Sequence, residues 1–263
     1  MKIRPSVCFI LLGLLLVLLF AADLLLGSVS LAAGEVVRVL TGHSSDPQAT
    51  TLVTHFRLPK AVSAIVVGAA LSASGLQMQT LFRNPLAGPY VLGISSGASL
   101  GVSLFLLGAP LLGISFASEA LRNVGIVGSA WIGGALILLV IMAVSARLKD
   151  IMAILILGMM FGSAASAVVQ ILQYLSTDSA LKSFVIWTMG SLGGVSLAQL
   201  GLMSGIVLAG LILSVYLIKP LNLLLLGENY ARTMGLNVRI TRLLLFVSTT
   251  LLAGTVTAFC GPI

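Results

Sequence analysis

The residues with chemically reactive side chains are few and lie far apart in this sequence. The two histidines, His43 and His55, lack a set of acidic or cysteine partners at metal-ligand spacing, whereas zinc sites usually need three or four protein ligands. The two cysteines, Cys8 and Cys260, lie in apolar segments, where free cysteines are usually buried. We therefore interpret the histidines as solvated residues of an outer loop. We expect both cysteines to be buried, with no disulfide, metal site or cofactor.

Nucleotide chemistry is not encoded either. A phosphate-binding P-loop needs a Gly-Lys pair followed by Ser or Thr, and none of the five lysines follows a glycine. A membrane enzyme would require a convergent polar site, and the sequence offers none. We expect this chain to have no catalytic activity of its own.

The composition of the chain is strongly apolar, and this determines which structural elements can position these residues. Hydrophobic residues make up 59% of the 263 residues and charged residues 8%, and the mean hydropathy is +1.17, so the polar surface is too small to cover a water-soluble globule. The 14 Lys and Arg exceed the 7 Asp and Glu but form no basic patch with neighbouring aromatic residues, which argues against nucleic-acid binding. We therefore expect a membrane protein surrounded by lipid.

Long unbroken apolar runs predict an all-α, polytopic transmembrane helix bundle, because lipid tolerates only helices or closed barrels and such runs exclude a barrel. The first run could be a secretory signal cleaved near Ala32 to Gly34, but its length favours a retained span. A glycine-rich stretch between Phe184 and Leu197 predicts a short or broken helix. We predict seven spans: Pro5 to Gly27, Ala61 to Leu81, Val91 to Leu107, Val124 to Ala146, Ile151 to Gln173, Ala198 to Ile218, and Ile240 to Phe259.

The basic residues predict the orientation of these spans, because they accumulate in cytoplasmic connections. With the N-terminus in the cytoplasm, nine basic residues lie inside: Lys2, Arg4, Arg83, Arg147, Lys149, Lys219, Arg232, Arg239 and Arg242. Five lie outside: Arg38, Arg57, Lys60, Arg122 and Lys182. The bias favours a cytoplasmic N-terminus and a cytoplasmic loop from Lys219 to Arg242.

Small residues recur four apart within three of the spans. These strips are Ala64, Gly68 and Ser72; Gly93, Gly97 and Gly101; and Gly158, Gly162 and Ser166. Such strips allow helix backbones to approach closely in a membrane. They fit tight bundling, and they also fit a smooth wall along a path for a bulky substrate. The sequence does not separate the two interpretations.

The predicted spans contain almost no ionisable residues. Ion-coupled transporters usually carry ionisable groups near mid-bilayer, whereas Asp23, near the outer end of the first span, fits a helix-end role better than a proton relay. We therefore expect a passive scaffold driven by a partner. The alternative, an ion-coupled secondary transporter of a small solute, would depend on a proton or sodium gradient.

One cytoplasmic segment suits contact with that partner. Glu228 stands near a helix start and Gly235 just past its end, which matches the usual capping and dipole preferences. The pattern predicts a short surface helix. An ordinary interfacial connector between two spans is the alternative.

Three stretches resemble the FecCD-type permeases, the membrane subunits of binding-protein-dependent ABC importers for ferric siderophores, haem and cobalamin. They are RLPKAVSAIVVGAALSASGLQMQTLFRNPLAGPYVLGISSGASLG from Arg57, WTMGSLGG from Trp187 and LGENYARTMGLNV from Leu226. The resemblance implies a second permease subunit, identical or different, with two cytoplasmic ATPase subunits and a periplasmic or lipoprotein substrate-binding protein. It also implies ten spans per subunit in the bacterial inner membrane. We therefore expect residues 1–263 to form one permease domain that lacks about three C-terminal spans.

The resemblance also implies roles for individual residues. The segment with Gly227, Glu228, Ala231, Arg232 and Gly235 is expected to couple to the ATPase. Arg57 and Lys60 are expected to dock the binding protein, although the family often has arginine where Lys60 stands, and lysine lacks the bidentate fork. The turn at Asn84, Pro85 and Leu86 is expected to form an inner gate, with Gly93 and Gly97 along the translocation path; without the resemblance, a plain turn would be the simpler interpretation.

Overall fold

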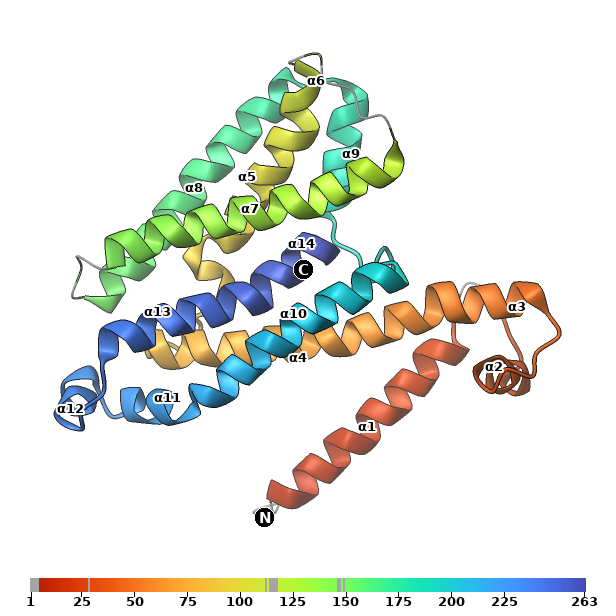
Figure 1. The fold of residues 1–263 in the computed structure, drawn as a ribbon, viewed down its shortest axis with the longest axis horizontal. Helices are drawn as coiled ribbons and strands as arrows, with labels where there is room; N and C mark the ends of the chain where they lie inside the picture. Colours follow the sequence, from red (N-terminus) through yellow and green to blue (C-terminus); the bar gives the residue numbers. More distant parts are fainter. Residues whose placement is uncertain (1–4, 28, 112, 114–117, 146–147, 149) are drawn as a thin grey trace. The chain divides into compact units, whose positions relative to one another are not determined.

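The computed structural model describes residues 5–27, 29–111, 113, 118–145, 148 and 150–263 (Figure 1). Every regular element in these ranges is helical, which confirms the all-α prediction. The described chain divides into two compact units. Unit 1 comprises Met1–Ile65 and Leu192–Leu200, and unit 2 comprises Val66–Ser191 and Gly201–Ile263.

Unit 1 contains the first membrane-length helix and a short helical hairpin. Its elements are α1 (Pro5–Leu25), α2 (Ala33–Leu40), α3 (Pro47–Thr51), the π-helical η1 (Leu52–Arg57) and the start of α4 (Leu58–Phe82). The Asp46 side chain caps α3 by accepting a hydrogen bond from the Gln48 amide, as expected for an N-cap residue before a proline. A small apolar core holds these elements together: Leu24, Val36, Val39, Ala49, Val53 and Ala61.

Unit 2 continues with the remainder of α4 and a bundle of further helices (Figure 1). The first group is the 3-10 helix η2 (Pro89–Leu92), α5 (Ile94–Ser103), the π-helical η3 (Leu104–Gly108), α6 (Ala109–Leu111), α7 (Glu119–Ser145), α8 (Ile151–Leu175) and α9 (Asp178–Thr188). The second group is α10 (Leu197–Tyr216), which starts in unit 1, then α11 (Ile218–Leu225), α12 (Glu228–Thr233), α13 (Val238–Thr249), the π-helical η4 (Thr250–Gly254) and α14 (Thr255–Cys260).

Among the described residues of unit 2, two clusters of buried apolar side chains contribute to the core. The larger one joins the end of α4, the α11–α12 segment and α13, with Phe82, Leu224 and Phe246 among its members. The second gathers residues of α5, α7, α8 and α9 around Val102 and Phe184. Because the backbone amides and carbonyls of a helix form hydrogen bonds within that helix, only side chains need to pack between neighbouring helices.

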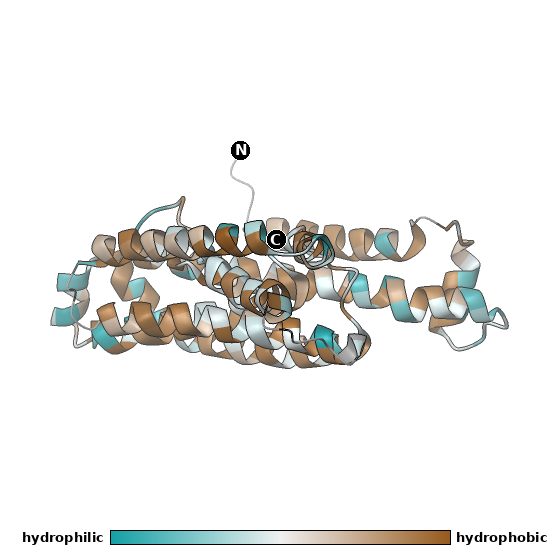
Figure 2. Ribbon diagram, turned by 90° about the horizontal axis from the view of Figure 1, so that it is seen from above, coloured by the Kyte–Doolittle hydropathy of each residue, from teal (hydrophilic) through white to brown (hydrophobic). Residues whose placement is uncertain are grey.

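Seven described helical runs are long and apolar enough to cross a membrane, which matches the seven predicted spans. They are Ser6–Leu25, Pro47–Phe82, Ile94–Leu111, Leu121–Ser145, Ile151–Leu175, Leu197–Tyr216 and Val238–Cys260. Helix α9 has only 11 residues, as the glycine-rich stretch predicted. Apolar residues colour most of these runs, and hydrophilic residues gather where the chain turns back between α10 and α13 (Figure 2).

Three of the seven runs contain a π-helical turn: η1, η3 and η4 each lie inside a continuous helix. A π turn holds one residue more than an α-helical turn and often marks a functional position. The sequence pattern, read with a period of 3.6, does not reveal these turns.

Within the described part of unit 2, basic residues that were assigned to opposite sides of the membrane lie at different ends of the bundle. Arg232 and Arg242 line one cavity with Ser145 and Leu148, so the α12 end of the unit is also where α7 ends and α8 begins. Lys182 lies on α9, at the other end of the unit (Figure 1). Four of the residues assigned to the cytoplasm lie outside the described residues: Lys2, Arg4, Arg147 and Lys149.

Candidate functional site

The α11–α12 segment between two spans carries five of the predicted site residues. Gly227 separates the two helices with φ +117°, and Gly235 follows α12 with φ +85°, both in a backbone region that favours glycine. Helix α12 begins at Glu228 and ends at Thr233. The prediction of a short capped helix is confirmed.

Glu228 faces inward and holds α12 against a membrane span. Its carboxylate accepts a hydrogen bond from the guanidinium of Arg242 on α13, whose side chain is 6% exposed. The Arg232 guanidinium lies 3.9 Å from the same carboxylate, one turn along α12. A hydrogen-bonded, largely buried pair fixes geometry far better than an exposed one, so Glu228 positions α12 relative to α13.

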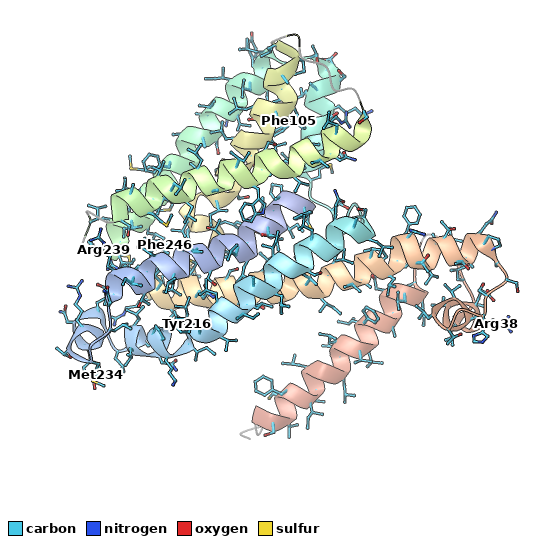
Figure 3. The ribbon with its side chains drawn as sticks, in the orientation of Figure 1. Arg38, Phe105, Tyr216, Met234, Arg239 and Phe246 are labelled. Carbon is cyan, nitrogen blue, oxygen red and sulfur yellow. The ribbon has the colours of Figure 1, made fainter. Side chains whose placement is uncertain are left out.

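The side chains of α12 divide into a buried face and an exposed face. Ala231 is fully buried and belongs to the apolar core, so it packs α12 onto the bundle. Tyr230 and Met234 are 50% and 59% exposed, and the Arg232 side chain is 57% exposed. The side chain of Met234 projects outward at this end of the unit (Figure 3). The surface that another protein could touch includes these three residues, with Asn229 and Thr233 exposed beside them. Tyr230 and Met234 were not among the site residues predicted from the sequence, although large apolar side chains in a charged loop could have indicated them.

The predicted gate turn begins where α4 stops. Helix α4 ends at Phe82, and Arg83 has φ +48°, a left-handed conformation that costs a non-glycine residue about 1–2 kcal/mol. The Asn84 side-chain oxygen accepts a 2.9 Å hydrogen bond from the Leu86 amide, and the Asn84 carbonyl accepts one of 3.0 Å from Ala87. Pro85 prevents the helix from continuing, and Leu86 is 89% exposed.

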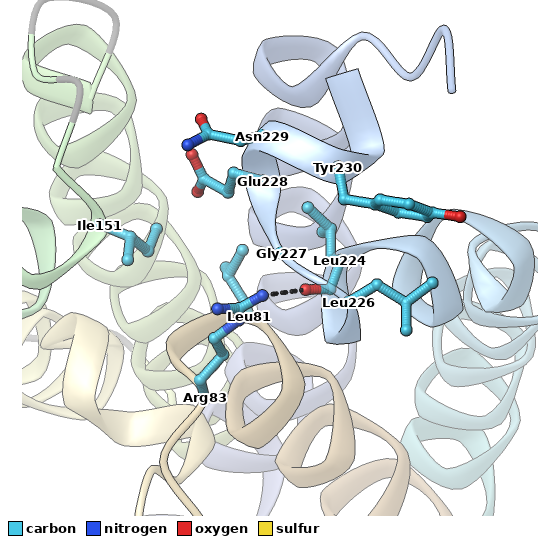
Figure 4. A pocket seen from close by; sticks show the side chains of 9 residues that line it. All are labelled: Leu81, Arg83, Ile151, Leu224, Leu226, Gly227, Glu228, Asn229 and Tyr230. Atoms are coloured by element: carbon cyan, nitrogen blue, oxygen red, sulfur yellow. Dashed lines mark hydrogen bonds between the residues drawn. The ribbon is translucent and has the colours of Figure 1, made fainter. Parts of the chain in front are cut away.

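Arg83 also joins this turn to the α11–α12 segment. Its Nη2 donates hydrogen bonds to the carbonyls of Leu224, at 3.0 Å, and Leu225, at 3.4 Å. Arg83 and Leu224 border a cavity of about 500 Å³ whose walls also include Ile151 and Tyr230 (Figure 4). The predicted gate and the predicted coupling segment are thus neighbours.

The small-residue strips have different surroundings. Gly97 of α5 packs on α7, because a Cβ at Gly97 would lie 2.6 Å from the Gly133 carbonyl oxygen. A Cβ at Gly158 of α8 would lie 2.6 Å from the Val91 carbonyl oxygen. Both contacts are close backbone packing. The third strip, Ala64, Gly68 and Ser72, is exposed on α4.

A second cavity of about 500 Å³ opens between η2, α5 and α8. Gly93 lines it at its α5 side, while Gly97 is not among its lining residues. Its polar lining comes from side chains that carry no charge: Tyr90, Ser96, Ser163, Ser166 and Gln170. Such a surface offers hydroxyl and amide groups to a solute without an ionic site.

Unit 1 contains the two residues predicted to dock a binding protein. Arg57 is 7% exposed, and its guanidinium donates hydrogen bonds to the carbonyls of Leu24 at 2.7 Å, Leu25 at 3.0 Å, and Val29. It therefore caps the C-terminus of α1, where carbonyls lack intrahelical partners. Lys60 is exposed and forms a 2.7 Å ion pair with Asp23 in the last turn of α1, the helix-end position expected for that acid.

Residues 14–263 match the model of one protein family, the FecCD transport family. The chain belongs to the FecCD transport family. It is a multi-pass membrane permease of the ABC-transporter type.

Individual FecCD-type relatives carry named transport functions. The chain is 37% identical to the hemin transport system permease protein HmuU of Yersinia pestis, with 100% of the chain and 76% of that protein covered. It is 36% identical to the vitamin B12 import system permease protein BtuC of Escherichia coli, with 89% and 69% covered. A solved structure of a metal-chelate type ABC transporter in an inward-facing conformation superposes with a TM-score of 0.82 at 30% identity, and the match covers 99% of this chain and 77% of that one.

The reactive side chains of this FecCD chain stay dispersed. Among the described residues, no group of three or more His, Cys, Asp or Glu could hold a metal ion. Cys260 is buried as predicted, whereas the prediction is wrong for Cys8, which is exposed on α1. His43 lies in a loop, but His55 lies within η1, because the second long helix starts earlier than its apolar stretch.

Proposed function

We propose that this chain is the membrane-spanning subunit of an ATP-binding-cassette importer that carries an iron-siderophore, haem or cobalamin-type ligand across the bacterial inner membrane. Membership of the FecCD family supports import driven by partner subunits. The ligand names of the two relatives and of the solved transporter support a bulky chelate. The orientation we propose has the N-terminus and the α11–α12 segment in the cytoplasm.

The observation that carries the proposal is the exposed face of α12. Tyr230 and Arg232 on α12 and Met234 directly after it are exposed. Ala231 and Glu228 anchor the same helix to the bundle. Such a surface suits a cleft in another protein, because tyrosine, arginine and methionine are enriched at protein interfaces and tyrosine and arginine often contribute most of the binding energy. We propose that this face of α12 binds a cytoplasmic ATPase subunit. The same face of a second permease subunit would bind a second ATPase subunit.

Substrate passage and delivery use the other sites in this proposal. The uncharged polar cavity between α5 and α8 forms part of the path, and the Asn84–Ala87 turn forms its inner gate. The substrate-binding protein docks at the outer side, where exposed Lys60 is the better placed of the two predicted residues, since buried Arg57 is occupied by carbonyl groups. Charge attraction there would set docking rate and register.

The test reconstitutes the chain with its ATPase and binding protein in liposomes and measures uptake of labelled haemin, cyanocobalamin and a ferric siderophore. We expect uptake of one ligand that requires ATP and the binding protein and persists with a protonophore. Uptake that needs no ATP and collapses with the protonophore would support a secondary transporter instead.

A matched pair of variants tests the α12 surface in the same preparation. Tyr230→Ala is expected to reduce ATPase binding about tenfold or more, as for an interface hot spot. Tyr216→Ala removes a tyrosine from α10 that is 71% exposed and lies away from α12 (Figure 3), and is expected to leave binding unchanged. Equal binding by both variants would contradict the contact.

A further inference from the structure

Arg83 occupies the junction between two regions with different proposed roles. Its backbone directly precedes the Asn84–Ala87 turn, and its side chain reaches the last carbonyls of α11. Leu225 is the final residue of α11, and Leu226 and Gly227 connect it to α12. One side chain therefore spans the distance from the end of α4 to the start of the α12 helix.

The chemistry of this contact is that of a helix end. The last carbonyls of a helix lack intrahelical partners and carry partial negative charge. The Leu224 carbonyl already accepts a 3.1 Å hydrogen bond from the Gly227 amide, and its second lone pair accepts from Arg83. A guanidinium can serve two such oxygens with a planar, permanently charged group, which a lysine ammonium does less well.

Two further observations concern the backbone on each side of this contact, at Gly227 and at Arg83. A Cβ at Gly227 would lie 2.9 Å from the Arg83 Nη2, so any larger residue there would displace the guanidinium. Arg83 itself has φ +48°, and such a conformation persists only where its surroundings determine it. The turn fixes the backbone of Arg83, and the α11 carbonyls fix its side chain.

We propose that Arg83 is a positioning residue that transmits movement of α12 to the Asn84–Ala87 turn. The role rests on the proposed function, in which α12 contacts the ATPase and the turn is a gate. Glu228 provides a parallel connection, because its bond to Arg242 ties α12 to α13. A displacement of α12 therefore acts on two spans: on α4 through Arg83 and on α13 through Glu228.

The first experiment measures the number of ligands imported per ATP hydrolysed in the reconstituted complex. Arg83→Gln is expected to lower this ratio about tenfold, the effect of losing roughly one charge-assisted hydrogen bond. Arg83→Lys keeps the positive charge but loses the planar guanidinium that can donate to two carbonyls, and its ratio is expected to be intermediate. Arg239→Gln removes an exposed arginine at the start of α13 and is the matched control. A wild-type ratio for Arg83→Gln would overturn the proposal.

The second experiment follows the connection in the chain itself, with no dependence on transport. Spin labels at Leu86→Cys in the turn and Thr233→Cys in α12, with Cys8 and Cys260 replaced by alanine, report the distance between the two regions. We expect a narrow distribution that Arg83→Gln broadens and Arg239→Gln does not. An unchanged distance distribution in Arg83→Gln would overturn the proposed role of Arg83, even if the complex transports. Failure of the wild-type chain to bind an ATPase would instead overturn the proposed function. In that case the spin labels would still test whether Arg83 holds the turn and α12 together.

Discussion

The Gln77 side-chain nitrogen lies 2.6 Å from the hydroxyl oxygen of Ser214, which joins α4 to α10 inside unit 2. The same nitrogen donates a 3.0 Å hydrogen bond to Ser248 on α13. The Gln77 carbonyl oxygen accepts one of 3.3 Å from Thr249. A single buried amide therefore cross-links three spans through neutral polar groups, which associate helices in a lipid environment without an ionic cost.

Replacement of this amide should loosen the three spans. Gln77→Leu removes the hydrogen bonds and leaves buried hydroxyl groups with fewer partners, so we expect a loss of about 1–3 kcal/mol in stability. Thermal unfolding in detergent or nanodiscs measures it. Gln79→Leu makes the same change at an exposed position of α4 and should have little effect. Equal melting of the two variants would contradict a structural role for the network.

Glycine is required where α5 crosses α7. Gly97→Ala places a methyl group 2.6 Å from the Gly133 carbonyl oxygen and from a side-chain carbon of Ile137, so the helices must separate. We expect destabilisation of about 1–3 kcal/mol, as for other overpacked sites. At Gly68 of α4, a Cβ meets nothing within 4 Å, and Gly68→Ala should be neutral or slightly stabilising because alanine favours helices. The same unfolding assay compares them.

Arg57 and Lys60 should respond differently to the same substitution. Arg57→Gln leaves the α1 carbonyls without their buried charged donor, so we expect about 1–3 kcal/mol of destabilisation and faster hydrogen exchange at the end of α1. Lys60→Gln breaks an exposed pair and should cost less than about 1 kcal/mol. If binding-protein affinity falls in Lys60→Gln while stability holds, the docking prediction for Lys60 gains support; wild-type affinity would contradict it.

The sequence predicted the seven spans and the short α12 helix because hydropathy and capping are local properties. It did not predict that Arg57 turns inward, since its three carbonyl partners lie about 30 residues earlier in the chain. Nor did it separate Ala231, which is buried, from its exposed neighbours Tyr230 and Arg232 on a six-residue helix. A helix that short gives too few turns for an apolar face to show in the residue pattern.

The π turn η4 makes the span Val238–Cys260 tolerant of a change in chain length at one point. One residue corresponds to about 100° of rotation in an α-helix, and deleting it from a regular α-helix rotates everything that follows by roughly that angle. A π turn already holds one residue more than an α-helical turn, so deleting a single residue from η4 would close it to an α-helical turn and leave α14 facing its present neighbours. Val256 and Ala258, both buried, would then keep their places in the core although the span had become one residue shorter.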